Sequence, residues 1–235
     1  MIKTLRYYNN NLDKYSFKER FNVFYDSVNT INKAGRIHPQ FYGFENVTED
    51  TTLFLSNHQG KYDGIGITLA LKDHPFSFLA EKEMLEQPFY KEIPKMLEIK
   101  IIDKKSYKSQ YNAILEMGED LKKGMNHLAF PEGDFFDNHN ELQEFHSGCL
   151  KAAYISKCTI QPICLYDSWK VYGKSSFKKI KPEVHILKPI KYDEYKDLTR
   201  VELKELVKER IAEKLKEILK EKGFLGEEEN EVLTN

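Results

Sequence analysis

The sequence predicts an α/β protein whose mixed, largely parallel sheet is flanked by helices. Two observations carry this prediction. The chain has 235 residues, enough for one large domain with its own core, and short apolar runs alternate along it with longer helical patterns. Such alternation is typical of a sheet whose strands are joined by helices. We expect strands at 52–56, 76–80, 99–102, 127–130, 160–165 and 184–187.

The intervals between these strands carry helical patterns, at 63–72, 83–97, 108–123 and 146–157. A capping box formed by Thr199 and Glu202 predicts a long C-terminal helix with one apolar face and one solvated Lys/Glu face. This helix is expected to end near Gly223. An acidic tail at 226–235 follows it and shows no recognisable function.

Residues 1–40 are expected to form an N-terminal helical segment ahead of a main domain at 41–225. They carry seven Lys or Arg against three Asp or Glu, and seven aromatic side chains. Ser16 and Glu19 form a second capping box, after which apolar residues recur at helical spacing: Phe17, Phe21, Phe24, Val28 and Ile31. A basic helix with an aromatic stripe can lie in a membrane interface, or its stripe can pack on the main domain. The sequence leaves both interpretations open.

The composition indicates which classes of protein and which cellular location are consistent with the chain. The formal net charge is −1, so the chain lacks the overall basic field that nucleic-acid-binding proteins use. Cys149, Cys158 and Cys164 are odd in number and show no C-x-x-C spacing, which indicates reduced thiols in a cytosol. The sequence shows no signal peptide and no run of ~20 apolar residues. We therefore expect a cytoplasmic protein that meets any lipid substrate peripherally, at the inner face of the cell membrane.

A histidine and an aspartate follow the first of the six expected strands. His58 and Asp63 lie five residues apart, which on one helix is a rotation of roughly 500°, or about 140° net. The two side chains therefore meet only if His58 lies in the turn before a helix and Asp63 in its first turn. A neutral imidazole can take a proton from a hydroxyl, and a carboxylate can orient it. The pattern predicts a general base with its partner; the alternative is a surface histidine beside an N-capping aspartate.

Three further motifs accompany this one, so that four blocks follow in order, at 57–63, 98–104, 130–135 and 159–164. In order and separation they resemble the glycerolipid acyltransferase family, which includes the bacterial 1-acylglycerol-3-phosphate acyltransferases. The blocks of that family read approximately N-H-x4-D, G-x-x-F-I-x-R, F-P-E-G-T-R and V-P-V. The resemblance spans roughly residues 50 to 190.

The resemblance implies roles for individual residues. His58 would be the general base and Asp63 its orienting partner, and backbone amides at 60–64 would be oxyanion donors. Substrate-binding residues would be Asn57, Lys104, Lys105, Phe130, Pro131, Glu132, Gly133 and His146. No cofactor and no metal are expected.

The chain departs from the family pattern at five positions. Lys104 replaces an arginine that contacts the substrate phosphate, and a lysine lacks the bidentate fork. Glu98 replaces a glycine, Asp134 a threonine, and Phe135 an arginine, so that a phosphate-binding cation is missing. His146 replaces the lysine of a following F-K-x-G block, as a phosphate contact or simply as a polar residue that opens a helix.

The implied function is direct transfer of a fatty acyl group from a thioester donor to the hydroxyl of a lysophospholipid, most simply lysophosphatidic acid. The donor would be acyl carrier protein or coenzyme A in acylated form. The lysine-rich stretch at 170–181 would contact phosphate head groups or an acidic acyl carrier protein, unless it is only a solvated loop. Partners are thus the donor, the lysophospholipid and the membrane surface, with no nucleic acid. Three alternatives stay open: the same chemistry on another lysolipid or an amine, a metal-dependent hydrolase using His58, Asp63 and Glu132, and a non-catalytic lipid-binding module.

Overall fold

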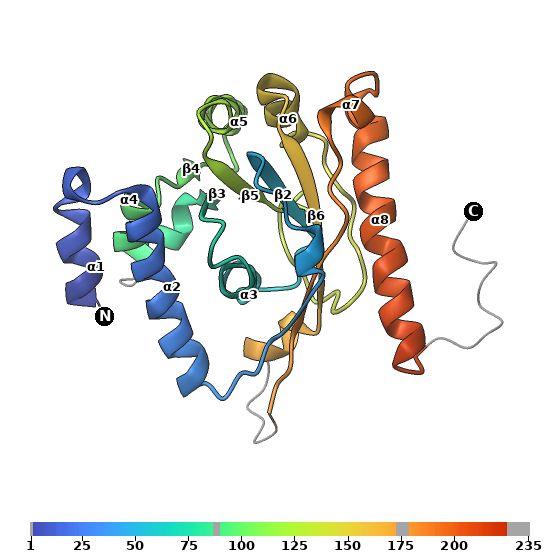
Figure 1. The fold of residues 1–235 in the computed structure, drawn as a ribbon, viewed down its shortest axis with the longest axis horizontal. Coiled ribbons are helices and arrows are strands. Elements are labelled where there is room, and N and C mark those ends of the chain that lie inside the picture. Colours follow the sequence, from blue (N-terminus) through green and yellow to red (C-terminus); the bar gives the residue numbers. More distant parts are fainter. Residues whose placement is uncertain (1, 87–89, 173–178, 225–235) are drawn as a thin grey trace.

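The computed structural model describes residues 2–86, 90–172 and 179–224, which form an α/β fold around one sheet (Figure 1). Its strands run in the order β1-β7-β6-β2-β5-β3-β4, and every neighbouring pair is parallel except β6–β7. Their bounds are β1 Gln40–Tyr42, β2 Thr52–Ser56, β3 Phe76–Glu81, β4 Lys100–Ile102, β5 Asn126–Ala129, β6 Thr159–Tyr166 and β7 Glu183–Ile186. The prediction of a mixed, largely parallel sheet is confirmed.

All six strands expected from the sequence are present, to within one or two residues at each end. The strand β1 was not predicted from the sequence; it is a three-residue edge strand that pairs with β7. Its segment Gln-Phe-Tyr is too short to show an alternating pattern.

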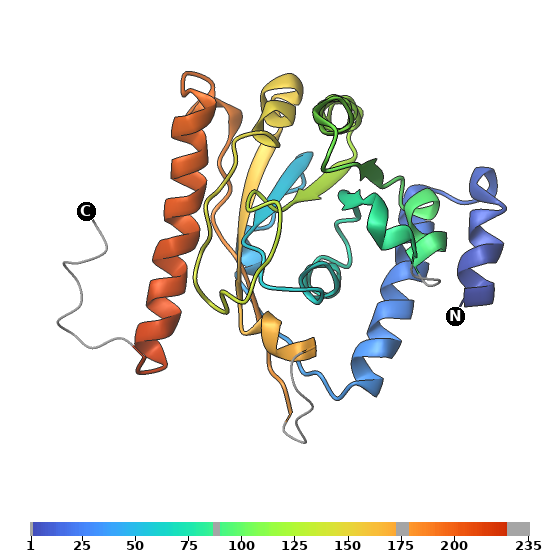
Figure 2. The same cartoon turned by 180° about the vertical axis from the view of Figure 1, so that it is seen from behind.

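Helices cover both faces of the sheet, as Figures 1 and 2 show from opposite sides. One face is covered by α2 Phe17–Ala34, α3 Asp63–Ala70 and α4 Ile93–Met96, with α1 Ile2–Asn9 outside them, and the other by α5 Tyr107–Lys122, α6 Leu150–Ser156 and α8 Arg200–Glu221. A short α7, Tyr192–Tyr195, precedes α8. Successive side chains of β2 divide between the two cores, since Phe54 packs with α2 and α3 while Leu53 and Leu55 pack with α6 and α8.

The expected helices at 108–123 and after Thr199 are present, but two predictions were wrong. The segment 83–97 is not one helix: a 3-10 turn spans Lys82–Glu86, and among the residues of this segment that the structure describes only Ile93–Met96 are α-helical. Pro94 has no N–H and is tolerated only in a first helical turn, which is where it lies. The helix expected at 146–157 begins only at Leu150, because the residues before it continue the loop that follows β5.

The aromatic stripe of α2 packs on the domain. Phe21, Phe24 and Val28 are buried in the core on this face of the sheet. Arg20, 7% exposed, donates to the carbonyl of Met96 at 2.7 Å and forms an ion pair with Glu98 at 2.6 Å. Packing therefore accounts for the stripe, and the membrane-interface alternative is not needed to explain it. Within the described ranges, every helix is too short or too polar to span a bilayer.

The contacts of Glu98 show how this chain tolerates a glutamate where the family pattern has glycine. Its φ is 54°, in the left-handed region that favours glycine, the residue that the resembled family carries here. A side chain in this region costs about 1–2 kcal/mol. The ion pair with the buried Arg20 and the hydrogen bond from Ser77 Oγ to the Glu98 carbonyl, 3.0 Å long, hold the residue there.

Candidate active site

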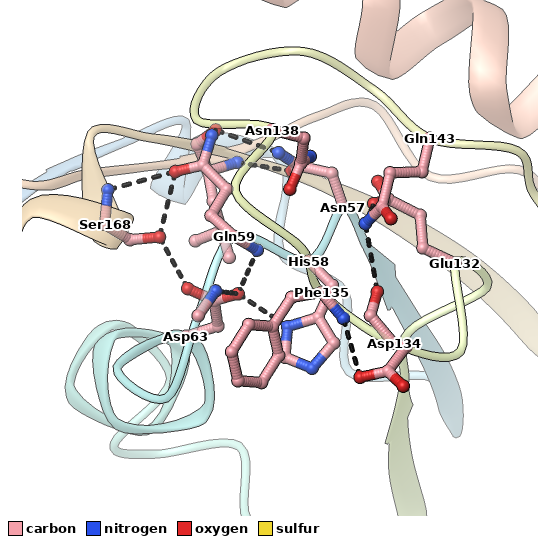
Figure 3. A network of polar contacts seen from close by, with 12 residues as sticks. Asn57, His58, Gln59, Asp63, Glu132, Asp134, Phe135, Asn138, Gln143 and Ser168 are labelled. Carbon is pink, nitrogen blue, oxygen red and sulfur yellow. Dashed lines mark hydrogen bonds and ion pairs between the residues drawn. The ribbon is translucent and has the colours of Figure 1, made fainter. Parts of the chain in front are cut away.

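The candidate site lies at the edge of the sheet where the parallel strands β2, β5 and β6 end. His58 follows β2, Glu132 follows β5 and Ser168 follows β6. Because parallel strands carry their carboxyl ends to the same edge, three segments far apart in the sequence meet here. Figure 3 shows their side chains converging.

His58 and Asp63 are in direct contact. Asp63 is the first residue of α3 and His58 lies in the preceding turn, as their spacing predicts. The distance from His58 Nδ1 to Asp63 Oδ2 is 2.7 Å; the Asp63 side chain is fully buried and that of His58 is 17% exposed. An ionised carboxylate only accepts, so Nδ1 carries the proton and Nε2 keeps the lone pair that a base needs.

The Asp63 carboxylate accepts three further hydrogen bonds. The main-chain N–H groups of Gln59 and Gly60 donate to Oδ2 at 2.5 and 2.9 Å, and Ser168 Oγ donates to Oδ1 at 2.5 Å. The carboxylate is thus held rigidly toward the imidazole. One expectation is corrected here: the Gly60 amide faces Asp63 and is not free to hold an oxyanion.

Two amide side chains tie this turn to β6. The amide of Asn57, 1% exposed, donates to the carbonyl of Leu165 at 3.0 Å and accepts from its N–H at 2.8 Å. Gln59 Oε1 accepts from the N–H of Ser168 at 3.0 Å, and its Nε2 donates to Asn140 Oδ1, also at 3.0 Å. Asn57, expected to bind substrate, is therefore engaged in holding the turn. Sequence reasoning missed Gln59, Asn140 and Ser168, and only the position of Gln59 beside His58 offered a signal.

Two phenylalanines pack against the His58 ring. The Phe130 ring stacks on it with a centroid distance of 4.1 Å and an interplanar angle of 16°, and the Phe135 ring meets it edge-on at 4.8 Å. Phe135 occupies the position where the resembled family has arginine. Here it gives the imidazole an apolar wall where a cation would otherwise stand.

The Phe130–Gly133 block forms a tight turn beneath the histidine. Gly133 has φ +74°, and the His146 N–H donates to the Pro131 carbonyl at 2.8 Å, so the two motifs of the sequence lie side by side. Glu132 is 5% exposed, and burial raises the pKa of its carboxyl although Gln143 and the main chain of His58 oppose the change. Gln143 Nε2 donates to Glu132 Oε2 at 2.5 Å. The His146 side chain is exposed beside Gly133.

Lys104 is held between two carboxylates. Its Nζ lies 2.6 Å from Glu81 Oε1 and 2.8 Å from Asp134 Oδ2. Burial alone would lower the pKa of Lys104, but its hydrogen bonds with Asp134 and Glu81 raise that pKa overall. Burial alone would raise the pKa of Asp134, but its hydrogen bond with Lys104 helps to lower that pKa overall. Lys105 is exposed beside it. The two departures at 104 and 134 are therefore coupled, since the new carboxylate pairs with the new lysine.

Comparison with known proteins places this site in a family. The family model described as Acyltransferase matches residues 38–166, more than half of the chain, and the matched range contains His58, Asp63 and the Phe130–Gly133 block. The chain belongs to the Acyltransferase family. A second family model, Immunity protein 44, matches residues 134–235, which is less than half of the chain.

Curated relatives and a solved structure agree with membership of the Acyltransferase family. Probable 1-acyl-sn-glycerol-3-phosphate acyltransferases of Mycoplasma pneumoniae and Mycoplasma genitalium are 27% and 26% identical over 53% and 63% of this chain. The matches cover 47% and 54% of those proteins, so the chain spans about half the length of the curated relatives it matches. The 1-acyl-sn-glycerophosphate acyltransferase PlsC of Thermotoga maritima shares the fold, with a TM-score of 0.67 and 20% identity over 81% of this chain and 79% of PlsC.

Proposed function

We propose that this member of the Acyltransferase family transfers a fatty acyl group from a thioester to the hydroxyl of a lysophospholipid, with His58 as general base. The 2.7 Å contact between His58 and a fully buried Asp63 is the observation that carries the proposal. The oriented imidazole faces the end of the sheet where α/β proteins bind their ligands.

In the proposed reaction, His58 Nε2 removes the proton of the acceptor hydroxyl as its oxygen attacks the thioester carbonyl. Asp63 stabilises the imidazolium that forms. The tetrahedral intermediate then collapses, the carbon–sulfur bond breaks, and the imidazolium returns its proton to the leaving thiolate. The products are an ester and a free thiol, and the enzyme is restored.

Direct attack requires no acyl-enzyme. The sequence has no Gly-x-Ser-x-Gly motif. Cys158 and Cys164 are buried, and burial raises the pKa of both thiols, which disfavours the nucleophilic thiolate. For the metal-dependent hydrolase alternative, the described part of the chain offers no group of three His, Cys, Asp or Glu side chains placed to hold a metal ion.

Lysophosphatidic acid is the first acceptor to test, because both curated relatives are named as probable acyltransferases of 1-acyl-sn-glycerol-3-phosphate. The chain would act peripherally, at the cytoplasmic face of the membrane that holds this lipid. Purified protein should acylate lysophosphatidic acid when offered acyl-coenzyme A or acyl carrier protein thioesters. No acylation of any lysolipid in a panel of differing head groups, with either donor, would refute the proposal.

The ion pairs of Lys104 favour a second candidate function, in which the same acyl transfer acts on a lysolipid acceptor without a phosphomonoester. Lys104 is already neutralised by Glu81 and Asp134, and Phe135 supplies no cation. On this candidate, Asp134→Thr removes one of the two carboxylates that neutralise Lys104 and raises kcat/KM for lysophosphatidic acid relative to lysophosphatidylcholine, by about fivefold, or roughly 1 kcal/mol. Asp193→Asn is the matched control, because it removes the exposed carboxylate that pairs with Lys196, a lysine outside the candidate site. A wild-type preference for lysophosphatidic acid that Asp134→Thr leaves unchanged would exclude the candidate.

Ser168 is expected to act as a positioning residue through Asp63. Ser168→Ala removes one hydrogen bond to a buried carboxylate, so kcat should fall on the order of tenfold or more while KM for the acceptor stays constant. Ser168→Thr, which keeps the hydroxyl, should recover part of the loss. Ser156→Ala, which removes a hydroxyl bonded to a helix carbonyl, is the control. A fall in KM and kcat together, or no rescue by threonine, would contradict this role.

A further inference from the structure

A second feature of the surface adjoins the candidate site: a large cleft of about 1370 Å³ beside η5 (Ser168–Tyr172), the short orange helix near the bottom of Figure 2. Its lining includes Gln59, Gly60 and Phe135. Phe135 also contacts the His58 ring, so it stands where the cleft and the catalytic dyad meet. Glu183 and Lys222 also line the cleft.

The cleft carries lysines that nothing in the described structure neutralises. Lys170 pairs with Asp167 and Lys222 with Glu183, each at 2.6 Å. Lys61, Lys179 and Lys181 are exposed, line the cleft, and have no ion pair or hydrogen bond from their side chains among the described residues. Three free ammonium groups around one hollow favour a ligand with several phosphate charges. Part of the basic stretch at 170–181, including Lys174, Phe177 and Lys178, lies outside the described residues.

Aromatic rings line the same hollow. Tyr42 and Phe136 are 45% and 69% exposed, and Trp169 also lines the cleft, next to Gly60 of the active-site turn. Exposed ring faces offer stacking to a planar base of any kind. A cleft of this volume is also much larger than a lipid head group needs, since pockets for drug-sized ligands run to roughly 300–1,000 Å³.

We propose that this cleft binds the nucleotide part of a coenzyme A thioester, the acyl donor. The phosphates would lie against Lys61, Lys179 and Lys181, the base against the exposed rings, and the flexible arm would pass Phe135 to bring the thioester to His58. The inference rests on the proposed acyl transfer for the identity of the ligand. An acidic carrier protein is a less suitable partner, because these lysines line a hollow and a folded protein surface docks on an accessible face.

Binding of the donor nucleotide can be measured without any turnover. Trp169 is the only tryptophan of the chain and lines the cleft, so its fluorescence reports on occupancy. Titration of the full chain with coenzyme A should change this fluorescence saturably, and pantetheine, which lacks the nucleotide, should have no effect at the same concentrations. The double variant K179Q/K181Q should weaken coenzyme A binding on the order of tenfold. Lys188→Gln, an exposed lysine beyond the other end of β7, is the matched control and should bind normally.

Three results would overturn this assignment: equal binding of pantetheine and coenzyme A, unchanged affinity in K179Q/K181Q, or a response to acyl carrier protein or anionic phospholipid vesicles but not to coenzyme A. The readout separates this inference from the proposed function. Coenzyme A binding without acyl transfer would refute the proposed function alone, whereas acyl transfer from carrier protein without coenzyme A binding would refute only the assignment of the cleft.

Discussion

His58→Ala should lower kcat for acyl transfer on the order of 10²- to 10⁴-fold, the usual contribution of a positioned general base. His58 has an imidazole oriented by a buried carboxylate, with its second nitrogen left to accept a proton. The measurement is steady-state release of thiol from the acyl donor in the presence of lysophospholipid.

The loss should come without unfolding, because the His58 side chain is partly exposed and the buried Asp63 carboxylate keeps three other hydrogen-bond donors when His58 is removed. Thermal denaturation checks this point. His74→Ala, a partly exposed histidine in the turn after α3, should leave kcat unchanged. Turnover of the His58 variant within a few-fold of wild type would eliminate His58 as the base.

Asp63→Asn should be nearly as severe, with kcat lowered on the order of 10³- to 10⁴-fold, as expected when an imidazole loses the carboxylate that fixes its tautomer. The Asp63 carboxylate accepts from four donors, and an amide group would turn its NH2 toward some of them. Leaving buried donors unpaired costs about 1–3 kcal/mol, so the melting temperature should also fall.

Because Asp63→Asn affects both stability and rate, kcat must be measured well below the melting temperature of the variant. Asp73→Asn, at an exposed acid just beyond α3, is the control for a change of charge near this helix. A folded Asp63→Asn protein that retains more than about a tenth of the wild-type kcat would contradict the orienting role.

Much of the fold could be predicted because its signals are local. Apolar runs marked all the strands except a three-residue edge strand, and the capping boxes at Ser16 and Thr199 marked the starts of two helices that the structure confirms. The error at 83–97 has a local cause as well, since Pro94 interrupts a helical pattern that the apolar spacing suggested.

The contact between His58 and Asp63 could be predicted for the same reason, because both residues lie in one turn and its following helix. The contact between Ser168 and Asp63 could not be predicted. The two residues are more than 100 positions apart in the chain, and only the pairing of β6 with β2 brings them together. Likewise the sequence showed that positions 104 and 134 depart from the family, but not that Lys104 and Asp134 pair with each other. Long-range polar contacts depend on tertiary structure that no local pattern encodes.

Direct acyl transfer by a His58–Asp63 dyad predicts a fixed balance between thiol and lipid products. Wild-type protein, given an acyl thioester and a lysophospholipid, should release one thiol for each acyl ester formed, with little thiol release when the acceptor is omitted. His58→Ala should abolish both products together. Thiol release that does not depend on the acceptor and yields free fatty acid would contradict the claim and identify a hydrolase instead.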